Sequence, residues 1–530
     1  MNTPGDVYLV ILLPALLLVV MALVVILVEA FFPESFLGFP TRLATAGLAL
    51  IGFLAAGVTA GANWGTPGLQ VEDNSGMIIL DHYTLFLTMI FCLGGVLTVL
   101  ISIRYLEDTG AAVGEYYCLL LFATAGAYFM AAANHLIVVF LGLEVLSVAI
   151  YPLAGFLRRD RRSNEASLKY FLLGAFSSAF LLYGIALIYG ATGLGRLQMA
   201  AAPGASGAVS GLARLMLALG PLRFDQIIGY VLTRGSYAPV FWAGVALLLV
   251  GFCFKAALSP FHMWTPDVYD GAPTPVTAYM SAVVKAAAFA PFFRFFLDVL
   301  GRRSGSPGSY EIYSHWAMIM MAVAILTMTW GNLAAVAEPS MKRMLAYSSV
   351  AHAGYITVAL IAESSSALLF YLLVYTTMVI GSFACVSLLR RRSEGEALEI
   401  SEWTGVGLRY PWFGAAMALF MFALAGFPPT AGFMGKFIVF RAALETGANA
   451  GHQNGYIVLV SIALINSFIS IYYYLRVVIA MYRPAPADAE AVHLVRDRTA
   501  GAAILICVIG VILLGVYPQI AFGVLSTFRF

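Results

Sequence analysis

The sequence predicts an all-α polytopic membrane protein with about fourteen transmembrane helices, two of them broken at prolines. Hydrophobic residues make up 61% of the 530 positions and charged residues only 11%, with a mean hydropathy of +0.90. A soluble domain usually carries about 25% charged residues. The apolar residues fall into about fourteen runs, each close to the roughly 20 residues that one span needs.

The expected spans follow one another along the whole chain. Their predicted ranges are 7–31, 43–62, 79–103, 115–132, 135–157, 166–191, 238–259, 273–299, 312–335, 343–362, 366–389, 410–443, 456–480 and 500–522. The first run lacks a preceding basic segment and is too long for a signal peptide, so we expect a permanent span. The Gly/Ala-rich loop between the sixth and seventh spans contains VSGLARLMLALG, which fits a short interfacial helix better than a span.

Basic residues in the loops between spans predict the orientation. They are Arg158, Arg159, Arg161, Arg162, Lys342, Arg343, Arg390, Arg391, Arg392, Arg483, Arg496 and Arg498, and all lie on one side if both termini lie on the other. Arg302 and Arg303 are the exception. Since Lys and Arg favour cytoplasmic loops, we expect both termini on the periplasmic side of a bacterial plasma (inner) membrane.

Several function classes are disfavoured. The five cysteines are scattered through apolar runs, which argues against disulfides, a zinc site and an iron–sulfur cluster. A net charge of +2 gives no bulk attraction to nucleic acid. The sequence shows no P-loop, dinucleotide fingerprint, nucleophile elbow or HExxH motif. The energy for any transport must therefore come from an ion gradient or from a partner.

Three lysines lie in apolar sequence near helix-breaking residues. Lys255 precedes Ser259 and Pro260, Lys285 lies mid-span in SAVVKAAAFA, and Lys436 follows the double proline of GFPPTAGFMGKF. A proline removes a backbone donor and disrupts the helix, and in lipid the freed groups must face protein or a water-filled cavity. Ionisable residues at that depth are costly and mark ion pathways. Snorkelling to the interface is the alternative for Lys255.

The two interrupted spans, the seventh and the twelfth, are five spans apart. Because five is odd, the second copy runs inverted relative to the first, which is typical of transporter repeats. Glu144, on the fifth span, is either a structural partner of a neighbouring helix or a carboxylate that tunes a lysine. A nearby carboxylate stabilises the ammonium, and its withdrawal favours the neutral amine, so a Glu–Lys pair can act as a switch.

Three further residues are weaker candidates for a proton pathway. His262 follows Pro260, and His352 lies among hydroxyl groups in AYSSVAHAGY. Imidazole changes charge near neutral pH and suits a relay. Lys169 lies four residues after Glu165, so an intrahelical ion pair is its alternative role. The remaining histidines are expected at span ends or in loops: His82, His135, His315, His452 and His493.

At these residues the chain resembles the antiporter-like subunits of respiratory complex I. The similar runs are EASLKYFLLGAFSSAFLLYGIALIYGATG, KAALSPFHMWTPDVYDGAPTPVTAYMS, MKRMLAYSSVAHAGY and GFPPTAGFMGKF, and the resemblance covers about residues 80–480. It implies fourteen spans, with spans 4–8 and 9–13 as inverted five-helix repeats. The implied units are an N-terminal three-helix segment (1–110), the first repeat (111–305), the second repeat (306–482) and a last span (483–530).

The resemblance also favours one member of the family. The middle member carries glutamate where this chain has Lys436, and the largest has a long lateral helix after its last span, whereas this chain ends at Phe530. The small member matches at Glu144, Lys255, Lys285 and Lys436, and its lysine on span 6 resembles Lys169. The run EPSMKRMLAYSS departs from the family, which usually has Asp-Ile or Asn-Ile before Lys-Arg.

The resemblance implies a function and partners. A proton from the cytoplasm would reach the Glu144–Lys255 pair and pass through Lys285, with His262 or His352, to Lys436 and the periplasm. The chain itself would hold no cofactor, and FMN, iron–sulfur clusters and quinone would lie in partner subunits. Expected partners are the middle antiporter-like subunit, the small subunits next to this chain, other membrane-arm subunits and lipids.

Two alternatives remain open. The same motifs occur in subunits of multi-subunit cation/proton antiporters, membrane-bound hydrogenases and formate hydrogenlyases. A passive spacer of the membrane arm is the other alternative, although a spacer has no need for buried lysines.

Overall fold

A computed structural model describes residues 4–32, 34–65, 77–111, 113–200, 223–224, 227, 239–300, 309–391, 395–449, 453–485 and 492–525. Within these ranges the side chains of 4–8, 193–200, 309–315 and 449 are not described. The predicted interfacial helix in the loop after the sixth span therefore lies outside the described residues. So do Arg302, Arg303, Arg392 and His452, and the side chain of His315.

The first part of the chain is helical. They are α1 (Pro4–Phe31), α2 (Thr41–Ala62), α3 (His82–Asp108), α4 (Gly114–Ala132), α5 (Leu136–Ala154), α6 (Arg161–Ala200), α9 (Pro239–Ala256) and α10 (Thr265–Gly271). The next span begins as α11 (Thr274–Tyr279), passes through a π-helical turn, η2 (Met280–Val284), and continues as α12 (Lys285–Val299). A single 3₁₀ turn, η1 (Asn63–Gly65), extends α2.

The second part is also mainly helical. Its helices are α13 (Ser309–Ala337), α14 (Met341–Ile361), α15 (Ser365–Leu388), α16 (Val406–Arg409), α17 (Pro411–Ala425), α18 (Ala431–Asn449), α19 (Gln453–Tyr482), α20 (Arg498–Val516) and α21 (Gln519–Leu525), with a 3₁₀ turn η4 (Ile400–Trp403). Two short antiparallel strand pairs, absent from the sequence-based expectation, join loops: β1 (Ser35–Phe36) with β2 (Phe39–Pro40), and β3 (Leu389–Arg391) with β4 (Val492–Leu494).

The predicted count of spans is confirmed. In the part of the chain that the structure describes, thirteen helices are long and apolar enough to cross a membrane. The broken pair α17–α18 supplies one more crossing, since neither half is in that set. Helices satisfy their own backbone groups in lipid, which is why long apolar runs fold this way. Their ends are capped locally: the side chains of Asp81, Ser340 and Asp497 accept from the first turns of α3, α14 and α20.

Both predicted breaks are present, although each begins a few residues before its prolines. Helix α9 ends at Ala256, and Ala257 has a positive φ of 60°. Helix α17 ends at Ala425, and the next residue, Gly426, has a φ of 92°. Only glycine adopts such a conformation at little cost, so Gly426 is suited to end α17 there. The bonds Ser259–Pro260 and Pro428–Pro429 are cis.

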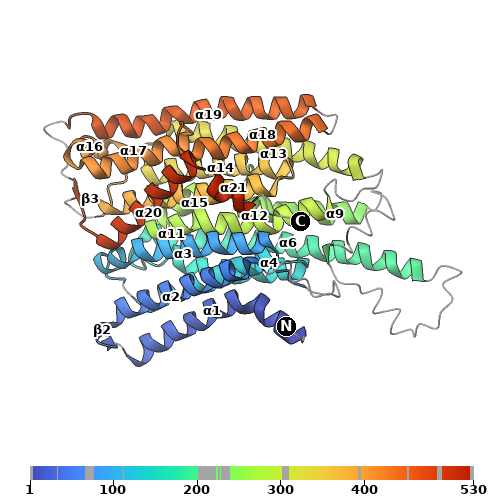
Figure 1. Cartoon of the computed structure of the whole chain (residues 1–530), viewed down its shortest axis with the longest axis horizontal. Helices are drawn as coiled ribbons and strands as arrows, with labels where there is room; N and C mark the ends of the chain where they lie inside the picture. The colour runs from blue at the N-terminus through green and yellow to red at the C-terminus, as the bar shows by residue number, and fades with distance from the viewer. Residues whose placement is uncertain are drawn as a thin grey trace.

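The helices lie side by side, from α1 and α2 at one edge to α19 at the other (Figure 1). Between them run α12, α14 and α15, the most buried spans: within Thr274–Val299, only Asp298 is partly exposed. Close helix contacts rest on small residues. A Cβ at Gly126 of α4 would lie 2.5 Å from the Leu146 nitrogen of α5, and one at Gly331 of α13 would lie 2.6 Å from the Ala351 nitrogen of α14. These are the small-residue contacts that hold membrane helices together.

Candidate functional site

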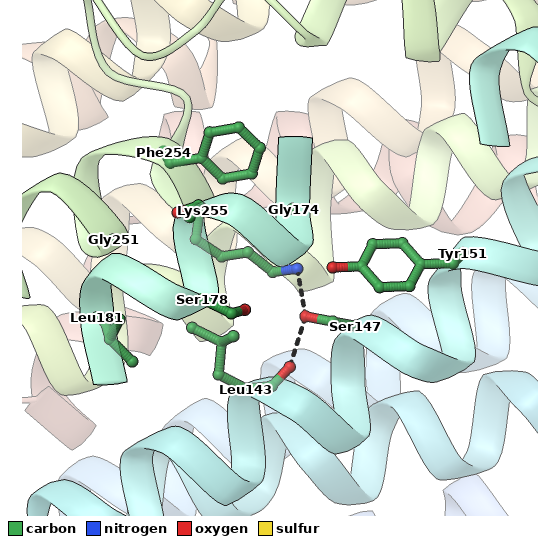
Figure 2. Close-up of a pocket in the computed structure, with 10 residues that line it drawn as sticks. Leu143, Ser147, Tyr151, Gly174, Ser178, Leu181, Gly251, Phe254 and Lys255 are labelled. Atoms are coloured by element: carbon green, nitrogen blue, oxygen red, sulfur yellow. Dashed lines mark hydrogen bonds between the residues drawn. The ribbon is translucent and has the colours of Figure 1, made fainter. Parts of the chain in front are cut away.

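Lys255 is the second-last residue of α9, just before the first break, and only 4% of its surface is exposed. Its Nζ donates to the hydroxyl of Ser147 on α5 at 2.7 Å and to that of Tyr170 on α6 at 3.1 Å. The ammonium also lies 5.1 Å from the centre of the Tyr170 ring and 5.9 Å from that of Tyr151. Figure 2 shows the side chain extending to Ser147, which in turn donates to the Leu143 carbonyl at 2.6 Å. Snorkelling is thereby excluded, because the ammonium group points into the bundle.

A small cavity adjoins this lysine. It is lined by α5, α6 and α9 residues, including Ser147, Tyr151, Ser177, Ser178 and Lys255, and offers about 10 Å³ to the centre of a water molecule. A cavity of this size holds about one water when polar groups line it. The hydroxyl groups around Lys255 meet that condition, so the site is suited to a hydrated amine.

Glu144 lies one turn before Ser147 on α5, and no ion pair joins it to Lys255. The carboxylate is near enough to act electrostatically on the lysine, but its buried Oε1 has no hydrogen-bond partner within the described chain. The neighbouring side chains Leu141, Val145 and Val148 on α5 are exposed at 55%, 43% and 62%. Glu144 therefore stands at the rim of the bundle, between Lys255 and the outer surface of α5.

Lys285 directly follows the π-helical turn η2 and is 2% exposed. Its Nζ donates to both the carbonyl and the hydroxyl oxygen of Ser349 on α14. It also lies 5.8 Å from the centre of the Tyr375 ring on α15. π-Helical turns often mark functional positions, and here the turn sets the register in which Lys285 meets α14.

His352 continues the polar face of α14 beyond Ser349. Its Nδ1 shares a hydrogen bond with the Tyr371 hydroxyl at 2.8 Å, and its Nε2 shares one with Tyr474 at 3.3 Å. The Tyr474 hydroxyl also bonds to Ser348. Both Lys285 and Lys436 act electrostatically on the imidazole. His352 is therefore within electrostatic range of both lysines and is hydrogen-bonded to two tyrosine hydroxyl groups.

Lys436 lies on α18, after the second break, and is 5% exposed. Its Nζ donates to the Ala425 carbonyl at the end of α17 and to the Ser467 hydroxyl of α19, each at 2.8 Å. It also lies 5.0 Å from the centre of the Tyr355 ring. The carbonyl end of a helix carries partial negative charge, so the broken helix itself binds this ammonium.

Lys169 is not part of this buried row. Its Nζ pairs with Glu165 at 2.6 Å, as its spacing allows, and with Asp267 of α10 at 2.9 Å. Asp267 also binds Arg343 at 2.8 Å. These groups line an open polar basin of about 250 Å³ at the starts of α6 and α14. Burial alone raises the pKa of Asp267, but hydrogen bonds from Lys169 and Arg343 outweigh it, so the pKa lies below its usual range.

His262 lies within the first break, is 7% exposed and packs its ring 6.0 Å from that of Trp330 on α13. Its Nδ1 has no partner within the described chain, and no described hydrogen bond connects its ring to a buried lysine. Of the other histidines, His82 and His135 lie at helix starts and His493 lies in β4, as expected. All five cysteines are free and buried, as expected.

Sequence reasoning missed the hydroxyl groups that bind the lysines. They are Ser147, Tyr170, Ser349 and Ser467, and the tyrosines that bind His352, Tyr371 and Tyr474, were missed as well. Helical spacing carried part of the signal, since Ser348, His352 and Tyr355 recur at intervals of three and four residues on α14. Sequence reasoning also missed Arg294 of α12. This residue is 5% exposed and donates to the Asp81 carboxylate at 2.6 Å and to the Ala131 carbonyl at 3.0 Å.

These groups are chemically able to exchange protons. Buried amines, imidazole, hydroxyl groups and a carboxylate supply donors and acceptors in turn, and no group of three or more His, Cys, Asp or Glu suited to a metal occurs among the described residues. Lysines at two broken helices of a many-span bundle define an antiporter-like membrane protein.

Comparison with known proteins identifies the family. A family profile described as NADH:quinone oxidoreductase/Mrp antiporter, TM, matches residues 133–470. The chain belongs to this family. NADH-quinone oxidoreductase subunit N of Trichlorobacter lovleyi is 40% identical over 512 residues, 96% of this chain and 94% of that protein. The same subunit of Myxococcus xanthus is 39% identical over 540 residues, 96% and 94% of the two chains.

Solved structures of related complexes contain chains with the same fold. A chain of respiratory complex I from Thermus thermophilus, determined with bound aureothin, superimposes with a TM-score of 0.73 at 31% identity, over 96% of this chain and 98% of that one. A chain of the Mrp complex from Dietzia sp. shares the fold, with a TM-score of 0.72 at 20% identity over 99% and 96%. The curated relatives are subunits N, so the predicted resemblance to the small antiporter-like member is confirmed.

Proposed function

We propose that this chain translocates protons across a bacterial inner membrane as a membrane-arm subunit of an NADH:quinone oxidoreductase, with both termini on the periplasmic side. The relatives named above support the complex, and the family as a whole is one of proton-translocating and antiporter subunits. Redox chemistry and its cofactors (FMN, iron–sulfur clusters and quinone) belong to partner subunits in this proposal.

The observation that carries the proposal is the series of buried lysines, each hydrogen-bonded to hydroxyl or carbonyl oxygens. Lys255 contacts α5 and α6, Lys285 contacts α14, and Lys436 contacts α17 and α19. His352 is within electrostatic range of the last two. A fixed structural ammonium would be expected to sit in an ion pair, because a buried unpaired charge is costly. An amine that gains and loses a proton is better served by neutral acceptors.

The proposed path runs from the Glu144–Lys255 region through Lys285 and His352 to Lys436. Glu144 stabilises the ammonium form of Lys255 from a distance, so a movement of either group changes which form is favoured. His262 and Lys169 have weaker support: His262 has no bonded connection to the row, and Lys169 is paired in the open basin. Moving one proton charge through a membrane potential of 100 mV costs about 2.3 kcal/mol. A modest change in the electrostatic environment of the lysines can therefore supply the energy of this step.

The test is made in the assembled complex. Lys255→Ala and Glu144→Ala are compared with Arg483→Gln, which removes an exposed arginine outside the buried row. We expect proton pumping per electron to fall in both buried variants while the control keeps the wild-type value. Wild-type quinone reduction and pumping in both buried variants would show that the pathway is wrong. Co-purification without flavin and iron–sulfur subunits would favour a cation/proton antiporter instead.

A further inference from the structure

We propose that a groove between α17 and α20 binds an anionic phospholipid. The groove has a volume of about 930 Å³ and lies between the first halves of these two helices, beside β4. Apolar side chains form most of its walls, among them Trp412, Leu419, Leu505 and Val508. No residue of the buried lysine row lines it, so the site is separate from the proton path.

The charges at one end of the groove fit a phosphate. Arg496 and Arg498 line this end, both are exposed, and neither makes an ion pair within the described chain. Asp497 stands between them, but its carboxylate accepts from the backbone and hydroxyl of Thr499. Two guanidinium groups are therefore available for an anion, and arginine binds phosphate oxygens in a bidentate fashion.

The length of the groove fits one leaflet. Its α20 wall runs from Arg498 to Val508, ten residues that rise about 15 Å at 1.5 Å each. That is half of the roughly 30 Å hydrocarbon core. Trp412, in the first turn of α17, is 91% exposed at the arginine end, and tryptophan favours the headgroup level. A headgroup at the arginines thus leaves acyl chains along the apolar walls, whereas a transmembrane helix would need twice this length.

Small residues keep the groove open. Ala415 and Ala416 form part of the α17 wall, and Gly501 lies on the α20 wall. A Cβ at Gly501 would meet no atom within 4 Å. A larger residue there is therefore tolerated by the fold and fills only the groove, which makes Gly501→Leu a clean variant. Gly47 of α2 has equally open surroundings and supplies a matched control, Gly47→Leu.

The experiment uses the complete complex in phosphatidylcholine vesicles that contain a trace of photoactivatable phosphatidylglycerol. Cross-linked peptides are identified by mass spectrometry, and unlabelled phosphatidylglycerol or phosphatidylcholine is added as competitor. We expect labelling on α17 and α20, with phosphatidylglycerol competing about 30-fold better, as two arginines at the surface predict. The double variant Arg496→Gln/Arg498→Gln loses this preference, Arg496→Lys/Arg498→Lys keeps it, and Gly501→Leu loses the labelling.

The controls Arg483→Gln and Gly47→Leu keep both the labelling and the preference. Equal competition by the two lipids in the wild-type complex overturns the proposal. So does loss of labelling in either control, or the finding that a helix of a neighbouring subunit occupies the groove in the assembled complex. Assembly of each variant is verified by native gel, and Gly501→Leu tests the site even where the arginine variant assembles poorly.

Discussion

The two broken helices bind their lysines in opposite ways. In the first, Lys255 precedes the break and is bound only by side-chain hydroxyl groups of α5 and α6. In the second, Lys436 follows the break and is bound by the Ala425 carbonyl, which belongs to the other half of the same broken helix. Relative to the break, the two lysines therefore stand at opposite positions along the chain.

This difference has a physical consequence. Hydroxyl groups and a distant carboxylate can rotate or move away, whereas a helix terminus presents a fixed dipole. We therefore propose that the surrounding complex changes the proton affinity of Lys255, whereas the environment of Lys436 is fixed by the helix terminus. In this proposal the Lys255 region receives the proton and the Lys436 region is the last step of the path, and the following variants test that assignment.

The largest effect is expected at Gly426, which ends α17 with a φ of 92°. A Cβ there would lie 3.1 Å from Cδ and 3.2 Å from Nζ of Lys436. Gly426→Ala should strain the backbone by about 1–3 kcal/mol and displace the ammonium from the Ala425 carbonyl. We expect a lower thermal unfolding temperature of the complex and a loss of pumping.

Gly47→Ala is the control for this variant, because its Cβ meets nothing within 4 Å and its φ is ordinary. It should leave both measurements unchanged. If Gly426→Ala pumps normally despite a lower unfolding temperature, the fixed position of Lys436 is not required for its role.

The second effect concerns Glu144, which influences Lys255 without touching it. Glu144→Gln keeps the shape and removes the charge. Two charges in contact at 4 Å attract each other by about 4 kcal/mol at an effective dielectric constant of 20. Because Glu144 is not in contact with Lys255, the free energy lost by removing its charge should be smaller than this. We therefore expect reduced but measurable pumping per electron. Glu445→Gln, at an exposed glutamate paired with Arg441, is the control. Complete loss in Glu144→Gln would imply that the carboxylate itself carries the proton.

Much of this comparison was predictable from the sequence. Apolar runs gave the spans, because a lipid-exposed backbone permits little but helix. Prolines located both breaks, because Pro260, Pro428 and Pro429 cannot continue a helix. Lys255, Lys285 and Lys436 stood out because charge in apolar sequence is costly.

The partners of the lysines were not predictable in the same way. Ser147, Tyr170 and Ser467 are ordinary residues of apolar helices, and their role depends on which helices lie side by side and in which rotation. The same holds for the ion pair of Arg294 with Asp81, which joins residues 213 positions apart. The π-helical turn before Lys285 carries no proline or glycine to announce it. Tertiary packing decides these features, and local sequence does not encode them.

The third effect distinguishes the two lysines directly. Ser147→Ala removes one of the two hydroxyl groups that bind Lys255, and a hydrogen bond to a charged group contributes about 1.5–3 kcal/mol. Ser467→Ala removes a similar bond from Lys436 but leaves the Ala425 carbonyl in place. We expect the greater loss of pumping in Ser147→Ala.

Additivity sharpens this prediction. Glu144→Gln and Ser147→Ala act on the same ammonium, so their effects on the pumping rate should not add, whereas Glu144→Gln and Ser467→Ala act on separate sites and should add. The measurement is a double-mutant cycle on the pumping rate. The reverse pattern of additivity would show that the carboxylate does not act through Lys255.

The smallest effect is expected in the open basin, where Asp267 joins α6 to α14. Its ion pairs with Lys169 and Arg343 are partly exposed, since 41% of the Asp267 side chain is accessible, and such pairs contribute about 0.2–1 kcal/mol each. Asp267→Asn should therefore lower the unfolding temperature only slightly. Because the pKa of Asp267 is lowered in the folded state, its contribution is present above the unfolded value of about 3.9 and is lost only as the pH falls further.

The difference in unfolding temperature between wild type and Asp267→Asn should thus be constant from about pH 5 to pH 8. High salt should reduce it, because exposed charges are screened. Glu445→Gln, in an exposed pair within one helix, provides the reference for a pair that joins no two helices. A difference that changes within this pH interval would mean that Asp267 exchanges protons near neutrality, and the basin would then belong to the proton path after all.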